Sequence, residues 1–581
     1  MSSTLRGIPA AAGVAIGSCV LYDPKPPVIP QQQIAPEAVT AEKERLQQAI
    51  EASMQEVSQL RDQVEARLGK EEAAIFDAHL LILEDEALLE GANQRIEQEL
   101  MNAERALWEA AGEFAQILAG LSDSYFQARA ADIHDIRTRV ISHLQGKSNP
   151  SLRFLNQPVV VAARDLLPSD TAGLDATYVL GLATEQGGPT SHTAILARQM
   201  GIPAVVGVPG LLSALQSQQM LPHRVALDGS AGTVEIDPDA ATIASYEAAL
   251  QKHRQQQVQL QSFRLLPAIT LDNVMVEIAA NIGSPHDAKL AAEAGANGVG
   301  LFRTEFLFLD RTTPPDEGEQ LAAYSAVLEV FAGKTVIVRT LDIGGDKSIP
   351  YLHLAAESNP FLGLRGIRLC LAEEYQYLFR AQLRALLRAA EAPAASLWIM
   401  LPMISDIGEI RKTKALLAEI EAELLQEGKL RTPVKQQIRL GIMVETPAAA
   451  LLVDVMAKEV DFFSIGTNDL AQYTLASDRM NASLAALHRP FHPAVMRSIA
   501  HIVTTSRRHE RWVGMCGEMA GDPRATAFLL GLGINELSME SSSLNAVKQV
   551  IRNTTTTQAQ ALVEHVLQAE SAGAVEELLT R

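Results

Sequence analysis

The 581-residue sequence contains only three cysteines, which lie far apart at Cys19, Cys370 and Cys516. This spacing provides neither a disulfide framework nor the closely spaced pairs of a zinc site, and it is typical of a reducing compartment. Basic residues are also scarce, because 49 Lys and Arg stand against 69 Asp and Glu and give a formal net charge of −20. We therefore expect no nucleic-acid binding, whereas a basic protein partner would suit such a surface.

Long apolar runs are missing as well. The longest segment without a charged residue, 199–222, contains four Gln and three Pro, so it cannot span a membrane. Gly and Pro interrupt the apolar stretch GIPAAAGVAIG near the start, which argues against a signal peptide. We expect a cytoplasmic protein without membrane insertion. Hydrophobic residues make up 47% of the chain, enough for a large core, and the length indicates about four structural units.

The first part of the chain predicts an α/β unit that is interrupted by helices. Residues 4–22 alternate like a strand pair, and a proline-rich segment, 24–36, follows them. Residues 37–145 are rich in Ala, Glu, Gln, Leu and Arg with helical periodicity, which predicts a bundle of about four helices. The expected breaks between these helices lie near Gly69, Gly91 and Gly120.

A glycine loop followed by a helix start is the main feature of this α/β unit. In GGPTSHTAILARQMG, residues 187–201, the glycines and the proline predict a turn, Ser191 an N-cap and Gly201 the helix end. His192 then lies in the first helical turn, where free N–H groups and the helix dipole favour an anion such as phosphate. A histidine there can receive a phosphoryl group as a nucleophile. The alternative is a capping turn with a solvent-exposed histidine.

The second half of the chain predicts a (β/α)8 barrel. A polar, Gln-rich helix comes first, and from about residue 267 apolar strand patterns alternate with helical ones. Close to eight strands over roughly 300 residues is the size and rhythm of this fold. The strand candidates are VMVEIAAN, GVGLF, TVIVRT, LWIML, IRLGIMVE, DFFSI, WVGMC and INELSM.

The whole sequence therefore predicts an α/β multidomain protein. The predicted parts are an α/β domain at 1–22 and 151–235, an inserted helical domain at 23–150, a linker helix at 236–263 and a barrel at 264–581.

Polar residues stand at or just after the predicted barrel strands, where active sites of such barrels lie. These residues are Asn281, Arg303, Arg339, Glu445, Asn468, Asp469 and Cys516.

Four arginines could converge there on one small ligand, and Lys347 could add a fifth cation. The arginines are Arg303, Arg339, Arg365 and Arg479. Arginine binds phosphate and carboxylate through paired hydrogen bonds, and Glu445 with the Asn468-Asp469 pair offers oxygen ligands suited to Mg²⁺. Together they indicate phosphoryl transfer. The alternative is that each arginine pairs with a neighbouring acid at the barrel rim, which we do not expect for all four at once.

Cys516 follows a predicted strand and lies between glycines in GMCGEMAGD. A free cysteine is most often a small buried hydrophobe, which is what we expect of Cys19 and Cys370. The position of Cys516 favours a proton donor or a nucleophile instead.

Taken together, these motifs closely resemble one family, Enzyme I of the bacterial phosphoenolpyruvate:sugar phosphotransferase system. The resemblance extends from GIPAAAGVAIG to the last helices, and its barrel motifs are very specific, whereas the His192 motif is shared with a wider group of swivelling phosphohistidine domains. The motifs that carry it are GGPTSHTAILAR, GVGLFRTEFLFLDR, RTLDIGGDK, NPFLGLRGIR, GIMVETPAA, DFFSIGTNDLAQYTLASDR and GMCGEMAGD.

The resemblance implies a function and a set of roles. The chain would transfer the phosphoryl group of phosphoenolpyruvate to its own His192 and then to the phosphocarrier protein HPr, releasing pyruvate as the first step of the sugar phosphotransferase system. Cys516 would protonate the enolpyruvate, and Glu445 with Asp469 would hold Mg²⁺. The substrate would be bound by Arg303, Arg339, Asn468, Asp469 and Arg479, with Arg365 and Lys347 nearby.

The resemblance also assigns roles to the predicted domains. The α/β domain would be the swivelling phosphohistidine domain, the helical insert would dock HPr, and the barrel would form a homodimer. One position departs from the family, because Pro189 stands where the family has Arg in GGRTSH. This change removes a cation and an N–H donor near the phosphate.

Two other interpretations use the same parts. A phosphoenolpyruvate synthase or pyruvate phosphate dikinase would need a large ATP-binding domain, and the sequence has no P-loop motif. A regulatory phosphocarrier that feeds a signalling branch would use the same catalytic core, although such relatives often carry an extra N-terminal sensor domain. A non-enzymatic scaffold would not need this whole set of polar residues.

Overall fold

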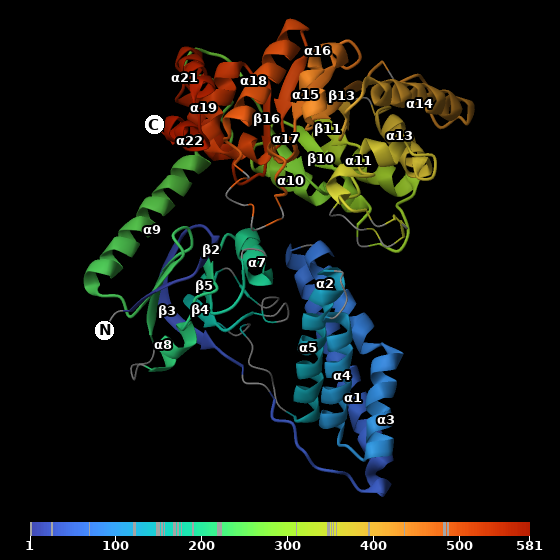
Figure 1. Ribbon diagram of the computed structural model, residues 1–581, viewed down its shortest axis with the longest axis vertical. Coiled ribbons are helices and arrows are strands. Elements are labelled where there is room, and N and C mark those ends of the chain that lie inside the picture. The colour runs from blue at the N-terminus through green and yellow to red at the C-terminus, as the bar shows by residue number, and fades with distance from the viewer. Residues whose placement is uncertain are drawn as a thin grey trace. The chain divides into compact units, whose positions relative to one another are not determined.

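The structure is a computed structural model in which the chain divides into two compact units, Met1–Gln255 and Gln256–Arg581 (Figure 1). No helix in the described part of the chain is long and apolar enough to cross a membrane. The structure describes residues 3–24, 27–68, 70–119, 124–146, 152, 155, 157–166, 170, 174–175, 177–188, 191–217, 223–309, 311–345, 349, 351–352, 354–355, 357–392, 396–434, 436–479, 481, 484, 487 and 489–580.

An eight-stranded sheet forms the α/β part of the first unit. Its central strands β3, β4, β5 and β6 are parallel, and antiparallel strands continue it on both sides. In spatial order the strands are β1 (Ser3–Arg6), β8 (Thr233–Ile236), β7 (Arg224–Asp228), β3 (Val14–Tyr22), β4 (Val159–Ala163), β5 (Val179–Thr184), β6 (Ala204–Val206) and β2 (Ile8–Ala11).

The N-terminal strands do not form the predicted pair with each other. Strand β1 pairs with β8 at one edge of the sheet, β2 pairs with β6 at the other edge, and β3 lies between β4 and β7. Gly13 between β2 and β3 has φ of 123°, a conformation that only glycine adopts without strain. The alternating pattern was therefore a correct sign of strands, but their partners are more than a hundred residues away in the sequence.

Five α-helices follow β3 among the described residues, where the sequence predicted about four. The break expected at Gly91 is wrong, because Gly91 lies inside α3, whereas Asp85 caps this helix and Leu100 ends it with φ of 53°. Gly69 and Gly120 lie outside the described residues. The helices, which pack on one another (Figure 1), are α1 (Val39–Leu68), α2 (Lys70–Leu83), α3 (Glu86–Glu99), α4 (Ala103–Ala119) and α5 (Ser124–Leu144).

The second unit is a closed barrel of eight parallel strands, as predicted. Each strand pairs with its neighbour in chain order, and β16 closes the barrel on β9. The strands are β9 (Glu277–Ile282), β10 (Val299–Arg303), β11 (Thr335–Arg339), β12 (Ser396–Leu401), β13 (Arg439–Val444), β14 (Phe462–Ile465), β15 (Trp512–Met515) and β16 (Glu536–Met539).

Helices cover the outside of this barrel after every strand. Helix α9 (Ala240–Gln261) comes before the first barrel strand, contains the boundary between the two units and lies within the segment predicted as the linker helix. The others are α10 (Pro285–Glu293), α11 (Glu317–Val330), α12 (Ile367–Leu371), α13 (Gln376–Ala389), α14 (Ile407–Gln426), α15 (Pro447–Leu451), α16 (Val453–Met456), α17 (Thr467–Leu475), α18 (Pro493–Arg508), α19 (Pro523–Leu532), α20 (Leu544–Arg552), α21 (Thr556–Gln568) and α22 (Ala572–Thr580).

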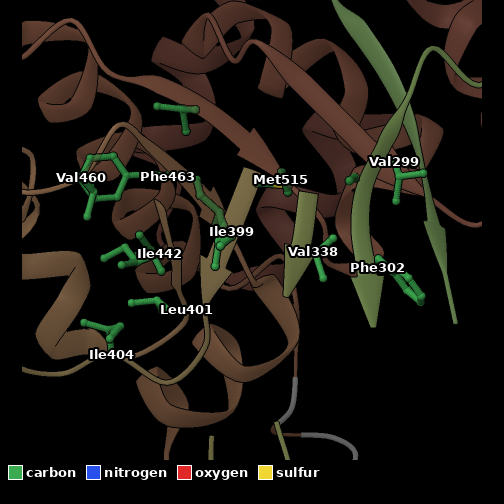
Figure 2. Close-up of a cluster of buried hydrophobic side chains, with 14 of the residues drawn as sticks. Val299, Phe302, Val338, Ile399, Leu401, Ile404, Ile442, Val460, Phe463 and Met515 are labelled. Atoms are coloured by element: carbon green, nitrogen blue, oxygen red, sulfur yellow. The ribbon is translucent and has the colours of Figure 1, made fainter. Parts of the chain in front are cut away.

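The main core lies between strands and helices. Val338, Ile399 and Ile442 are examples of outward-facing strand residues in this core (Figure 2). Alternate residues of the same strands, such as Ile337 and Met443, form a separate cluster inside the barrel. Because side chains alternate along a strand, this division fixes which residues at the strand ends turn toward the barrel axis.

Candidate active site

Strand alternation turns the predicted site residues toward the barrel axis. Ile337 lies in the inner cluster, so Arg339, two residues later on β11, has the same direction. Met443 and Glu445 have the same relation at the end of β13. Cys516, directly after β15, is itself a member of the inner cluster. The barrel thus gathers side chains that are distant in sequence at its C-terminal end.

A bulge in β10 decides the direction of Arg303. The pairing of β10 shifts register between Val299 and Leu301, and Leu301 then lies inside the barrel. Gly300 allows this close approach, since a Cβ there would lie 2.1 Å from Oε1 of Glu536. Arg303 consequently turns inward like Leu301 and pairs with Glu540, with 3.5 Å between Nη1 and Oε1.

Buried acids hold Arg339 and Arg365 at the C-terminal end of the barrel. Nη2 of Arg339 donates to Oε1 of Glu305 at 2.5 Å, and its Nη1 lies 3.1 Å from Oδ2 of Asp342. Asp342 also accepts from Nη2 of Arg365, at 3.3 Å and 3.2 Å for its two oxygens. Asp342 thus joins two guanidinium groups. Burial works against the charge of Arg339, but Glu305, Asp342 and Glu445 outweigh it and raise the pKa of Arg339.

Asp469 joins the same network from the first turn of α17. Its Oδ1 lies 3.5 Å from Nη1 of Arg365 and 3.9 Å from Nη1 of Arg479, and it has no hydrogen-bond partner. Asn468, its neighbour, turns to Glu518 instead: its Nδ2 donates to Oε1 at 3.0 Å, and its Oδ1 accepts from the Glu518 backbone N–H. The structure therefore joins Asp469 to the arginines but not Asn468.

Glu445 is 1% exposed and faces two other carboxylates. Burial, together with Asp469 and Asp342, raises the pKa of Glu445 to about 8. Its Oε1 accepts from the backbone N–H of Met403 at 2.5 Å, and Met403 has an unusual φ of 58°. The carboxyl group is therefore fixed in place in surroundings that disfavour its charge, unless a cation compensates it.

The residues present fit a divalent metal with an incomplete protein ligand set. No group of three or more His, Cys, Asp and Glu side chains among the described residues is arranged to hold a metal ion. Glu445 and Asp469 can supply two carboxylates, and Oδ1 of Asp469 lacks a hydrogen-bond partner. A Mg²⁺ ion commonly takes one or two carboxylates and completes its shell with water and substrate phosphate.

Cys516 is buried, and burial raises the pKa of its thiol to about 12. The thiol therefore keeps its proton at neutral pH, which suits a proton donor better than a thiolate nucleophile. Asn281 donates from Nδ2 to the Cys516 carbonyl at 3.1 Å, and the Ser538 hydroxyl donates to Oδ1 of Asn281 at 2.7 Å. These contacts fix the backbone at the end of β15. Cys370 is a packing residue, as expected, since it lies in the outer core.

His192 is the first residue of α7 (His192–Met200), as the sequence predicted. Ser191 is the N-cap and its Oγ accepts from the Ala194 N–H at 3.4 Å, while Gly201 ends the helix with φ of 65°. The first backbone N–H groups of the helix thus point toward its N-terminal end beside this residue. Pro189 lies outside the described residues, and so does Lys347.

The expectation that ion pairs would not explain all four arginines is wrong, because each of them has an acidic partner. For the two buried arginines, Arg339 and Arg365, burial requires this compensation, since a charge removed from water is costly without a counter-charge. The ion pairs nevertheless leave two N–H donors unused, because Nε of Arg339 and Nε of Arg365 are buried without a hydrogen-bond partner. An anion at the barrel end would satisfy them.

Sequence reasoning missed Glu305 and Asp342, although both belong to motifs that it quoted. Each follows a strand-end arginine closely, Glu305 two residues after Arg303 and Asp342 three residues after Arg339. An acid within one turn of an inward-facing arginine was the available signal. The partner of each acid depends on the barrel, because Glu305 pairs with Arg339 from the neighbouring strand.

Comparisons with known proteins agree with this arrangement. Residues 257–556 match the model of the "PEP-utilising enzyme, PEP-binding domain", residues 6–129 that of the N-terminal domain, and residues 155–232 that of the mobile domain of the same enzymes. A phosphoenolpyruvate-protein phosphotransferase of Bacillus sp. (strain S) is 45% identical over 579 residues, covering 99% of this chain and 97% of the relative. The chain belongs to the family of phosphoenolpyruvate-protein phosphotransferases.

Other phosphoenolpyruvate-protein phosphotransferases match equally completely. The relative in Staphylococcus carnosus (strain TM300) is 43% identical over 582 residues, covering 100% of this chain and 99% of the relative. A solution structure of "Enzyme I (nEIt) protein" is 37% identical and covers 43% of this chain and 99% of its own, with a TM-score of 0.39. Membership confirms the resemblance that the sequence indicated, and with it the transferase class and the fold class.

These relatives match the chain over nearly the whole length of both proteins. Their names favour a protein phosphotransferase over a synthase or dikinase. Enzymes that utilise phosphoenolpyruvate use a divalent metal, in agreement with the two carboxylates at the barrel end.

Proposed function

We propose that this chain transfers the phosphoryl group of phosphoenolpyruvate to His192 and then to a small phosphocarrier protein, HPr, with release of pyruvate. The observation that carries the proposal is the pair of buried arginines at the C-terminal end of the barrel. Nε of Arg339 and Nε of Arg365 have no partner there, beside the carboxylates of Glu445 and Asp469. Two unused donors beside two carboxylates suit an anion and a cation together.

The arginines would bind the substrate through its charged oxygens. Arg339 and Arg365 have their orientation fixed by Asp342, so their remaining donors would meet the phosphate with little further ordering. Arg303 and Arg479 are half-buried at the rim and would close on the substrate from the solvent side. Asn468 would have to leave Glu518 to contribute. Lys347, from the same motif as Asp342, completes the proposed set.

Glu445 and Asp469 would hold the metal, which we take to be Mg²⁺. When bound, the ion supplies positive charge that stabilises the phosphate and the enolate oxygen. The contribution of the protein is to keep two carboxylates close together in a buried place. Both charges are then compensated, which would lower the raised pKa of Glu445.

The transfer breaks the bond between phosphorus and the enol oxygen and forms a bond between phosphorus and a ring nitrogen of His192. The electron pair remains on enolpyruvate, whose terminal carbon then takes the proton of the Cys516 thiol to give pyruvate. The thiolate regains a proton from solvent. His192 must reach the barrel in this step and HPr in the next. We therefore propose that four domains move relative to one another. They are 1–22 with 151–235, 23–150, 236–263 and 264–581.

The proposal is tested with the full-length protein, labelled phosphoenolpyruvate and Mg²⁺. We expect one acid-labile label on His192, pyruvate in equal amount, and complete transfer of the label when unlabelled HPr is added. Label on another residue, or label that HPr does not remove, would contradict the assignment. Omission of Mg²⁺ should stop labelling. Replacement of Mg²⁺ by Mn²⁺ measures how selective the site is for the metal ion.

Two further expectations belong to the same proposal. The resemblance implies a homodimer through the barrel, which sedimentation of the full-length protein measures directly. The three unpaired cysteines suit a reducing compartment, so we place the reaction in the cytoplasm.

A further inference from the structure

A cavity lies at the opposite end of the barrel from the proposed reaction site. It has a volume of about 300 Å³. Three of its lining residues are the first residues of barrel strands: Glu277 of β9, Thr335 of β11 and Glu536 of β16. The cavity therefore opens at the N-terminal face, whereas Arg339 and Glu445 stand at the C-terminal ends of their strands. Its size is at the lower end of the range of small-molecule sites, which begins at about 300 Å³.

A buried carboxyl group lies at the inner end of this cavity. Glu536 is 2% exposed, and its Oε2 has no hydrogen-bond partner. Two glycines make room for it: a Cβ on Gly514 of the neighbouring strand β15 would lie 2.5 Å from Oε2, and a Cβ on Gly300 of β10, beyond β9, would lie 2.1 Å from Oε1. A buried polar atom without a partner is costly, so a carboxyl group kept in this place points to a ligand.

A second carboxyl group, that of Glu277, lines the outer part of the cavity. None of the ion pairs among the described residues involves Glu277 or Glu536. Burial and the charge of Glu277 raise the pKa of Glu536 well above its ordinary value, and burial raises that of Glu277 although Arg439 opposes it. Arg439 lies over the ring of Trp398 at 4.7 Å. Glu536 is therefore a buried carboxyl group without an ion-pair partner, and it lies beside a second carboxyl group that is exposed.

The other residues that line the cavity indicate which kind of ligand could supply a positive charge to these carboxyl groups. Lys334 also lines the cavity, and its Nζ lies 6.0 Å from the centre of the Phe331 ring. It forms no ion pair with Glu277 or Glu536 among the described residues. Pro267, Met275 and Val276 give the cavity an apolar wall. A bare metal ion would leave this wall uncovered, and the described residues provide no third carboxylate for it. An organic cation would meet both the wall and the carboxylates.

We propose that this cavity binds a small organic amine, with its ammonium group between Glu536 and Glu277 and its carbon chain against Met275 and Pro267. The site is separate from the proposed reaction and does not depend on it. An ammonium group beside Glu536 favours the charged form of this buried carboxyl group, so the amine should bind more tightly as the pH rises. Glu277 and Glu536, with Lys334 and Arg439 facing them, are the charged groups that determine this dependence.

The test compares 1,4-diaminobutane with 1,4-butanediol, which has the same length and no charge. Calorimetry and thermal unfolding of the full-length protein should show saturable binding of the diamine and none of the diol. Glu536→Gln, which keeps the shape of the side chain, should weaken the diamine roughly ten- to a hundredfold. Glu277→Gln changes a rim residue, so it should fold normally and weaken binding in the same direction.

Two further readouts separate this site from the reaction site. Calorimetry in two buffers of different ionisation enthalpy should show proton release on binding of the diamine, and neither variant should change the KM for phosphoenolpyruvate. Equal effects of diamine and diol, or wild-type affinity in both variants, would overturn the proposal. Competition of the diamine with phosphoenolpyruvate would overturn it too, because it would place the amine at the other end of the barrel.

Discussion

The two units of the chain place their reactive groups by different means. In the first unit His192 begins a helix directly after its cap, and the neighbouring contacts come from residues close in sequence, such as Ser191 and Ala194. In the barrel the polar groups come from different strands and hold one another, as Asp342 does between Arg339 and Arg365. Local structure positions the proposed nucleophile, whereas long-range ion pairs position the proposed substrate site.

This difference separates the expected effects of substitutions. A change at His192 should remove the chemistry of both half-reactions, because the same atom accepts and donates the phosphoryl group. A change in the barrel should affect only the reaction with phosphoenolpyruvate and leave the exchange with HPr unchanged. Six predictions follow, beginning with the largest expected effect; four of them test this separation, and two concern stability.

His192→Ala should abolish labelling by phosphoenolpyruvate and by phospho-HPr alike. The helix should remain, since Ser191 still caps α7 and alanine favours helix. Acid-labile label and circular dichroism measure the two outcomes. As the matched control, Ser191→Ala should lower the stability of the unit by about 1 kcal/mol through loss of the cap and still accept the label. Label in the His192 variant would show that another residue is the acceptor.

Glu445→Gln should lower phosphorylation by phosphoenolpyruvate on the order of 10³-fold, because one of the two proposed metal ligands loses its charge. The glutamine oxygen can still accept from the Met403 N–H, so the barrel should unfold at an unchanged temperature. Rapid-quench kinetics with each phosphoryl donor separates the two half-reactions. Normal activity at limiting Mg²⁺ would contradict the assignment, as would a loss of exchange with HPr.

Cys516→Ala should slow pyruvate formation by roughly 10²–10⁴-fold through loss of a general acid. Substrate binding should be nearly unchanged, because no hydrogen bond among the described residues joins the Cys516 thiol to one of the arginines. Cys19→Ala and Cys370→Ala serve as controls and should be kinetically silent. Pyruvate formation at the wild-type rate would remove Cys516 from the mechanism.

The same thiol predicts a pH dependence. Burial raises the pKa of Cys516 from 9.0 to about 12, so the folded protein keeps the proton where the unfolded chain has lost it. The thiol therefore contributes stability that is complete below about pH 9 and lost as the pH rises toward 12. In wild type, alkaline unfolding should begin earlier than in Cys516→Ala. Identical alkaline unfolding of the two proteins would contradict this burial effect.

Asp342→Asn should raise the KM for phosphoenolpyruvate and lower kcat/KM roughly ten- to a hundredfold, since two arginines lose a shared charged partner. Arg339 keeps Glu305 and Arg365 keeps Asp469, which limits the loss. Asp406→Asn is a control in the same barrel, because Asp406 only caps α14. Equal effects of both changes on KM would reduce Asp342 to a structural role, whereas partial rescue by Asp342→Glu would support positioning.

The smallest effect concerns two glycines of the first unit. Gly91→Ala should stabilise α3 by about 1 kcal/mol, because Gly91 is helical and a Cβ there meets Ala110 at an ordinary 3.7 Å. Gly201→Ala should destabilise α7 by a similar amount, about 1 kcal/mol, because Gly201 has φ of 65°. Thermal unfolding of the first unit measures both, and shifts of the same sign would contradict the difference between the two glycines.

The sequence was sufficient where the signal is local. Eight apolar strand patterns separated by helical ones predicted the barrel, because an alternation of this length has few other folds. The start of α7 at His192 and its end at Gly201 followed from capping preferences. The break at Gly91 failed, since one glycine costs only about 1 kcal/mol and the good helix formers around it outweigh that cost.

Contacts between distant residues were decided only by the tertiary structure. The first three strands alternate correctly in sequence, but β1 and β2 complete opposite edges of one sheet, which no local pattern encodes. The acids beside the arginines were visible in the motifs, yet the pairing of Glu305 with Arg339 across two strands was not. Residue types and alternation fix which side chains turn inward, whereas the closure of the barrel decides which charges meet, because electrostatic pairing depends on distance in space and not in sequence.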